Sequence, residues 1–163
     1  MEVTREKLSL DGFTPLGRKG LLPMTYGLIQ GIFCYETAAF LNGMSQFGDD
    51  VLFLYCPDIA EPINAGLFVY YPTLDGKLDF NECIVRAEGV YVTNPLRTIR
   101  ELIAKEAYVE QVCECLDWWN RVYGSLGSVV IDLELNGLLK KLQSYLDAMV
   151  EYGYIYNMWE TNK

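Results

Sequence analysis

The amino-acid sequence predicts an α+β fold: one buried helix, a small mixed or antiparallel sheet of about four strands, then about three helices. Two patterns predict it. Short apolar runs bounded by Pro, Gly or Asp lie between residues 51 and 92, and beyond Pro95 the apolar residues recur with a helical period. The chain has 163 residues, of which 51% are apolar, so a sizeable core is expected.

We expect a single domain, 1–163, because no repeat or low-complexity linker marks a boundary. Its parts are an irregular N-terminal arm over 1–31, a helix plus small sheet over 32–92, and a helical part over 93–163. The arm is rich in Gly and Pro, which favour turns and irregular chain.

The run 32–41 predicts a buried helix, because it is apolar on most sides and Asn42-Gly43 is typical of a helix end. Strands are predicted where β-branched and aromatic residues form short runs. Pro57 and Pro72 end two of these runs, and Asp75-Gly76 signals a turn. The four predicted strands are 51–56, 66–71, 82–86 and 90–92.

The second half begins with a helix-start signal: Asn94 suits the N-cap, and Pro95 suits the first helical position. Three helices are predicted at 95–105, 107–123 and 132–152, with Gly153 after the last one. The predicted buried face of the last helix consists of Leu135, Leu138, Leu139, Leu142, Tyr145, Leu146 and Met149. The aromatic tail 154–159 is expected to pack back onto the domain.

The formal net charge is −9, and it is unevenly distributed. Residues 1–32 contain four basic and three acidic residues (net +1), and the remainder contains nine basic and nineteen acidic residues (net −10). Such an acidic body argues against broad nucleic-acid binding, where Lys and Arg contacts to phosphate supply most of the affinity. It fits a basic protein partner.

The absence of histidine excludes Ser-His and Cys-His nucleophile pairs and histidine-ligated zinc. We therefore predict no catalytic residues, no metal and no cofactor. No apolar run approaches the roughly 18 residues of a membrane span. The N-terminus lacks the apolar segment of a signal peptide, so a cytoplasmic location is expected. The five cysteines are then expected to be reduced and mostly buried.

Arg97 and Arg100 are the first candidate binding residues, because cations near a helix start oppose the helix dipole. One interpretation is structural: Arg97 pairs with Glu101 four residues later, or Asp79 or Glu82 approaches from the sheet. The other is functional: a fixed guanidinium is presented to a carboxylate or phosphate of a partner.

Trp118 and Trp119 form an aromatic cluster with Tyr123 on the predicted helix 107–123. Adjacent helical residues point in different directions, so we expect one tryptophan in the core and the other at a contact surface. Arg18 and Lys19 are a further candidate contact to a partner or a phosphate backbone, although two charges in a loop are more often simply solvated.

Cys113 and Cys115 cannot share one ligand sphere on a helix, since positions two apart point to nearly opposite sides. We interpret them as buried structural cysteines. Carboxylates that lie beside loop signals are interpreted as solvated rather than catalytic. These carboxylates are Asp49, Asp50, Asp58 and Glu61.

Two segments of this sequence resemble the AbiEi-like family of type IV abortive-infection antitoxins and related transcriptional regulators. In the first, Thr37-Ala38-Ala39 and Gly43-Met44-Ser45 stand near the family pattern S-A-L-x-x-x-G-L-S. The second, 89–103, is similar to the pattern G-I-P-V-T-S-P-E-R-T-L-x-D-L-L. Its matching residues are Val92, Thr93, Pro95, Arg97, Thr98 and Leu102, with Glu101 where the family has aspartate. The resemblance covers roughly residues 30–105.

The resemblance implies a bacterial or phage-encoded protein-interaction domain without enzymatic activity, which counteracts a nucleotidyltransferase-like toxin. Family members also carry a winged-helix DNA-binding domain, for which the arm 1–31 is too short and too weakly basic. DNA binding is therefore not expected without a separate winged-helix module. The expected partner is a cognate toxin-like protein, and a homodimer is compatible with the sequence. The alternative is a regulator or nucleic-acid contact module that uses Arg18, Lys19, Arg97 and Arg100.

Overall fold

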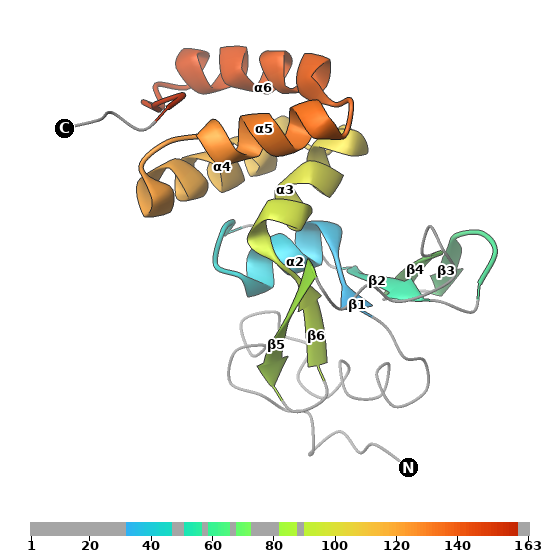
Figure 1. The fold of residues 1–163 in the computed structure, drawn as a ribbon. Coiled ribbons are helices and arrows are strands. Elements are labelled where there is room, and N and C mark those ends of the chain that lie inside the picture. The colour runs from blue at the N-terminus through green and yellow to red at the C-terminus, as the bar shows by residue number, and fades with distance from the viewer. Residues whose placement is uncertain are drawn as a thin grey trace.

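The computed structural model combines a sheet with helices stacked at one end of it (Figure 1). It describes residues 32–46, 51–56, 59–65, 68–72, 82–87 and 90–159. Within these residues there are six strands and five helices, so the predicted α+β fold is confirmed with two more strands and one more C-terminal helix than expected. The arm 1–31, with Arg18 and Lys19, and the turn Asp75-Gly76 lie outside the described residues.

The sheet is mixed, with the strand order β3-β4-β2-β1-β6-β5. The strands are β1 (Ile32–Phe33), β2 (Leu52–Cys56), β3 (Ile63–Ala65), β4 (Phe68–Pro72), β5 (Cys83–Ala87) and β6 (Val90–Thr93). β1 pairs with β6 and β2 pairs with β4 in parallel, whereas the other neighbours are antiparallel. The parallel pairs bring segments distant in the sequence together at the centre of the sheet.

The predicted helix 32–41 is wrong at its start, because Ile32 and Phe33 form the strand β1. Both side chains are 1% exposed between β2 and β6. A strand buried on both faces is apolar at every position, so periodicity cannot distinguish it from a buried helix. The edge strand β3 was not predicted, since it has three residues and Ile63 is 44% exposed.

Helices α2 (Tyr35–Leu41) and α3 (Pro95–Ala104) pack beside each other next to the sheet (Figure 1). Asn42 follows the end of α2, and its Nδ2 donates to the carbonyl of Thr93 at 3.0 Å. Asn94 caps α3, accepting at Oδ1 from the Arg97 N–H at 2.8 Å. The predicted cap is therefore confirmed, and the two segments that carry the family resemblance form one packed unit.

The C-terminal layer consists of α4 (Val109–Tyr123), α5 (Gly127–Leu135) and α6 (Leu139–Glu151) (Figure 1). The predicted single helix 132–152 is wrong, because the chain turns at Asn136-Gly137. Gly137 has a φ of +70°, which glycine adopts at no steric cost. As a consequence Leu135 is 81% exposed and Leu139 40% exposed, instead of lying on the buried face.

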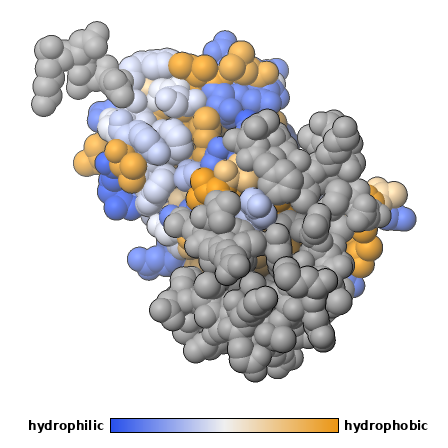
Figure 2. Space-filling model, turned by 60° about the horizontal axis from the view of Figure 1, so that its bottom comes forward, coloured by the Kyte–Doolittle hydropathy of each residue, from blue (hydrophilic) through white to orange (hydrophobic). Residues whose placement is uncertain are grey.

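The helical core is built from side chains of α3, α4, α5 and α6. Its fully buried members include Leu102, Leu116, Leu133, Leu142 and Met149. Other apolar side chains of these helices remain exposed, and Figure 2 shows orange apolar residues standing among blue hydrophilic ones on the face in view. Within the part of the chain that the structure describes, no helix is both long and apolar enough to cross a membrane.

The predicted packing of the tail 154–159 is confirmed. Tyr154, Tyr156 and Met158 pack against the helical core, whereas Ile155 between them is 86% exposed. The Leu126 N–H donates to the carbonyl of Asn157 at 2.7 Å, and the Asn157 N–H donates to Asn120 Oδ1 at 2.9 Å. The tail is thus an extended strap held to α4 and to the turn before α5.

Four of the five helices in the described residues end with the same pair of backbone hydrogen bonds, the Schellman pattern. In α2, α5 and α6 the residue with positive φ is Gly43, Gly137 or Gly153. In α3 this position is occupied by Glu106, with a φ of +56°. A residue with a Cβ atom costs about 1–2 kcal/mol in this conformation.

Glu106→Gly is therefore expected to raise the free energy of unfolding by about 0.5–1 kcal/mol. The substitution also removes the exposed pair with Lys141 at 3.8 Å, which contributes little. Urea denaturation measures the effect. Glu106→Ala is the matched control, since it removes the carboxylate and keeps the Cβ atom; equal stability of the Gly and Ala variants would contradict the prediction.

Candidate functional site

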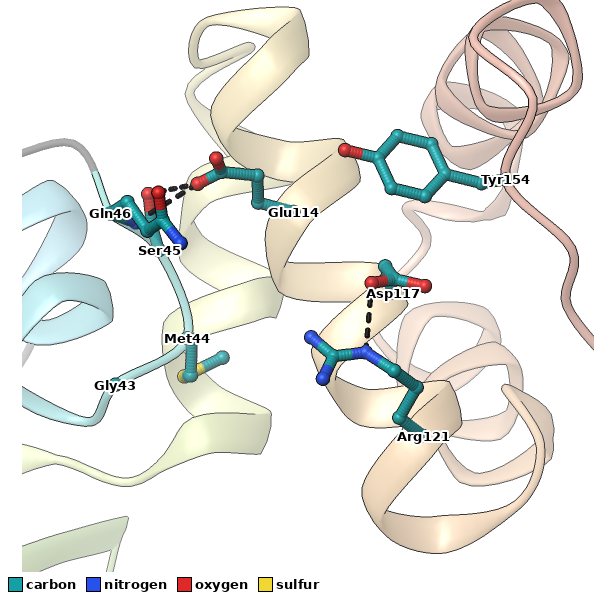
Figure 3. Close-up of a pocket in the computed structure, with 8 residues that line it drawn as sticks. All are labelled: Gly43, Met44, Ser45, Gln46, Glu114, Asp117, Arg121 and Tyr154. Carbon is teal, nitrogen blue, oxygen red and sulfur yellow. Dashed lines mark hydrogen bonds and ion pairs between the residues drawn. The ribbon is translucent and has the colours of Figure 1, made fainter.

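A groove of about 240 Å³ opens between the end of α2, one face of α4 and the start of the tail (Figure 3). We call it the α4 groove. Its lining residues are Gly43, Met44, Ser45, Gln46, Glu114, Asp117, Arg121 and Tyr154. They come from three separate segments, so only the folded chain forms this site.

Glu114 fixes one wall of the groove. Its Oε2 accepts from the Ser45 hydroxyl at 2.8 Å and from the Gln46 N–H at 3.0 Å (Figure 3). These two bonds tie the segment after α2 to the middle of α4. The carboxylate is therefore held in place before any ligand arrives, which lowers the entropy cost of binding.

Asp117 and Arg121 continue the floor of the groove, and Tyr154 forms the opposite wall (Figure 3). Arg121 Nε lies 2.9 Å from Asp117 Oδ2, and the arginine side chain is 66% exposed. Burial raises the pKa of Tyr154, and the carboxylates of Glu114 and Asp117 raise it further, so its hydroxyl stays protonated at neutral pH. The groove thus offers carboxylates, the hydroxyls of Ser45 and Tyr154, and one accessible guanidinium.

The acidic character extends along α4 beyond the groove. Glu110 lies one helical turn before Glu114, and Asp117 follows three residues after it. Residues at this spacing share one helix face. Glu110, Glu114 and Asp117 thus form an acidic row on α4. This pattern lies within the predicted helix 107–123, and the sequence interpretation missed it. Ser45 and Tyr154 had no comparable signal, since only the tertiary fold brings them to α4.

Arg97 lies in a charged cluster against the sheet, with its side chain 12% exposed. Its Nε is 3.4 Å from Glu101 Oε1, and its guanidinium carbon lies 5.4 Å from the centre of the Tyr55 ring. The Tyr55 hydroxyl donates to the same carboxylate of Glu101. The predicted pair with Glu101 is confirmed, and this partner explains a cation near the start of α3.

Arg100 bridges two carboxylates and is 18% exposed. Its Nη2 lies 2.5 Å from Glu82 Oε2, and its Nη1 lies 3.0 Å from Asp132 Oδ1. The pair with Glu82 was predicted, whereas Asp132 comes from α5 and was not. Asp79 lies outside the described residues. Both arginines are thus engaged within the fold, which disfavours the interpretation that they form an open basic patch.

The tryptophan pair divides as expected. Trp119 is 7% exposed in the helical core, whereas Trp118 is only partly buried. The ring centre of Tyr123 lies 4.2 Å from that of Trp119, and Tyr123 is 50% exposed. Trp118 and Tyr123 therefore reach the surface at the end of α4, and a partner role for them stays a prediction.

Cys113 and Cys115 are both fully buried, which confirms their interpretation as core residues. Burial raises the pKa of Cys113 to about 11 and that of Cys115 higher, so neither thiol ionises at neutral pH. Among the described residues no group of three His, Cys, Asp or Glu could hold a metal ion. Glu61 is exposed, and Asp49, Asp50 and Asp58 fall on residues that the structure does not describe.

The free energy of unfolding is expected to depend on pH through Glu101. Burial raises its pKa, and Arg97 and Tyr55 offset this effect only in part. A carboxyl group with a raised pKa binds its proton more tightly in the folded state than in the unfolded state. The protonated carboxyl therefore contributes its full stabilisation below the unfolded-state pKa of about 4.3. This contribution is lost as the pH rises through the folded-state pKa.

The difference in free energy of unfolding between the wild type and Glu101→Gln is accordingly expected to decrease as the pH rises from 4 towards 7. Glutamine preserves the size of the side chain and does not titrate, so the subtraction isolates this one group. Urea denaturation at several pH values provides the measurement. A difference that increases with pH would show that the ion pair with Arg97 outweighs burial.

A scan of the chain against models of protein families found no match, and a search of curated proteins found none either. The resemblance of residues 32–45 and 89–103 to AbiEi-like antitoxins therefore stays a prediction.

Proposed function

We propose that this chain is a non-enzymatic protein-interaction domain of the antitoxin type, acting in the bacterial cytoplasm. It resembles the body of type IV abortive-infection antitoxins, and its partner is a nucleotidyltransferase-like toxin. The observation that carries the proposal is the α4 groove, in which a preset carboxylate and an acidic helix face line a concave site. The net charge of −9 favours a basic partner over a nucleic acid.

The chemistry of the partner follows from this charge. A toxin that transfers nucleotides holds phosphate groups with Lys and Arg side chains. The acidic row of α4 complements such a surface, and its members Glu114 and Asp117 line the groove. Electrostatic complementarity of this kind raises the association rate and selects the partner. The groove would thus cover the basic residues that the toxin needs for its substrate.

The packing of the two family-like segments also supports the proposal. Ile32 pairs with Tyr91 in the sheet, and Asn42 donates to the Thr93 carbonyl. Thr98 Oγ1 lies 2.7 Å from Thr93 Oγ1. These residues serve the fold itself, so the resemblance concerns a scaffold, and binding falls to surfaces such as the α4 groove.

The test is co-purification with the protein encoded next to this gene, together with rescue of cell growth when that neighbour is expressed. The charge-reversed variant Glu110→Lys/Asp117→Lys is expected to lose binding and rescue. Asp147→Lys/Glu151→Lys is the matched control, because both of its residues are exposed on α6 and neither lines the groove. Equal binding by the two variants, or no binding by the wild type, would refute the proposal.

A further inference from the structure

The ammonium group of Lys105 is enclosed by aromatic rings and a carboxylate. Its Nζ lies 4.3 Å from the centre of the Tyr35 ring, 4.5 Å from that of Phe53, and 2.6 Å from Glu36 Oε1. We call Tyr35, Glu36 and Phe53 the ammonium cage. It is formed where β1 meets α2, against β2 and the end of α3 (Figure 1).

The cage is built rigidly before any ligand binds. Tyr35 has a φ of +49°, a conformation that costs a residue with a side chain about 1–2 kcal/mol. Strain of this kind persists where the surroundings require one placement of a side chain. Here it sets the Tyr35 ring 4.9 Å from Tyr71 and 6.4 Å from Phe53. The Glu36 side chain is 9% exposed, so its carboxylate is also fixed.

Aromatic faces combined with a carboxylate are the chemistry that recognises alkylammonium groups. Within the described residues the Lys105 ammonium group contacts Tyr35, Phe53 and Glu36. Lys105 follows the last residue of α3, and its side chain is 27% exposed. A flexible lysine stem at that position can swing into solvent and leave the cage open. The resident ammonium therefore marks the kind of group that the cage accepts.

We propose that the ammonium cage is a binding site for an alkylammonium group, carried by a small molecule or by a lysine side chain, and that Lys105 occupies it in the free protein and competes with that ligand. The cage shares no residue with the α4 groove, so this site is independent of the function proposed above. Removal of the competitor should tighten ligand binding, since the cage is then empty in every molecule.

The test is titration of Lys105→Ala with n-butylammonium, followed through the aromatic NMR signals. We expect binding at least about tenfold tighter than in the wild type. Lys105→Met is the matched control, because methionine fills the cage without a charge. Glu36→Gln in the Lys105→Ala background should abolish binding. A folded Lys105→Ala protein with no saturable binding, or with the same affinity as Lys105→Met, would overturn the proposal.

Two further arms complete the experiment. Tetramethylammonium and a blocked Gly-Lys-Gly peptide distinguish a small-molecule ligand from a lysine side chain, according to which one binds more tightly. In the wild type, tetramethylammonium should accelerate acylation of Lys105 by acetic anhydride, with Lys140 as the internal reference in mass spectrometry. This arm needs no variant, and an unchanged rate at Lys105 would count against displacement and thus against the proposal.

Discussion

Removal of residues 154–163 is expected to lower the free energy of unfolding by about 4 kcal/mol, the largest effect of any change considered for this protein. The truncation takes away the apolar side chains of Tyr154, Tyr156 and Met158, which pack on the helical core. Each contributes about 1–1.5 kcal/mol by burial. The Leu126 N–H, which donates to Asn157, also loses its acceptor.

Urea denaturation followed by circular dichroism measures this change. The control is a truncation after Trp159, which keeps every contact of the strap described above, so that its comparison with the longer truncation isolates the contribution of residues 154–159. Truncation also removes Tyr154 from the α4 groove, so partner binding should weaken beyond the loss expected from unfolding alone. If the protein without residues 154–163 were as stable as the full chain, the contacts of the strap would not contribute to the free energy of unfolding.

Arg100→Met is expected to lower the free energy of unfolding by about 2–3 kcal/mol, because it leaves two carboxylates facing each other without their cation. Glu82 and Asp132 both pair with Arg100, and Asp132 Oδ2 is buried without a hydrogen-bond partner among the described residues. Methionine preserves much of the apolar stem, so the loss reports mainly on the charge. Urea denaturation at neutral pH is the measurement.

The matched control is the double variant Arg100→Met/Asp132→Asn. It removes the buried carboxylate that the single variant leaves unpaired, so it is expected to recover about half of the lost stability. A deficit that the double variant does not reduce would assign the effect to packing of the arginine stem.

Helix starts and ends show how far local chemistry predicts this fold. Asn94 and Pro95 gave a correct start for α3, and Gly43 and Gly153 marked correct ends. Gly137 carries the same signal, yet apolar periodicity across it predicted one continuous helix. The periodicity misled because α5 is apolar on both its buried and its exposed faces, as the exposed Leu135 shows.

For the candidate binding residues too, contacts within one region of the chain could be predicted, whereas contacts between distant segments could not. The arginines were recognised as anomalous at the start of α3, and the pairs with Glu101 and Glu82 were correctly anticipated. Asp132 could not be anticipated, because α5 reaches α3 only through the packing of the helical layer. For the same reason no pattern in the sequence connects Lys105 with Glu36, which lies 69 residues away.

The sequence by itself determined the fold class, the N-cap of α3 and the burial of Cys113 and Cys115, because each depends on composition or on neighbours within a few residues. Only the tertiary structure decided that Ile32 and Phe33 form a central strand and that Tyr154 closes a groove opposite Glu114. These outcomes depend on contacts between distant segments. Local patterns record which side chains will be buried or charged, whereas the packing of the whole chain decides which of them meet.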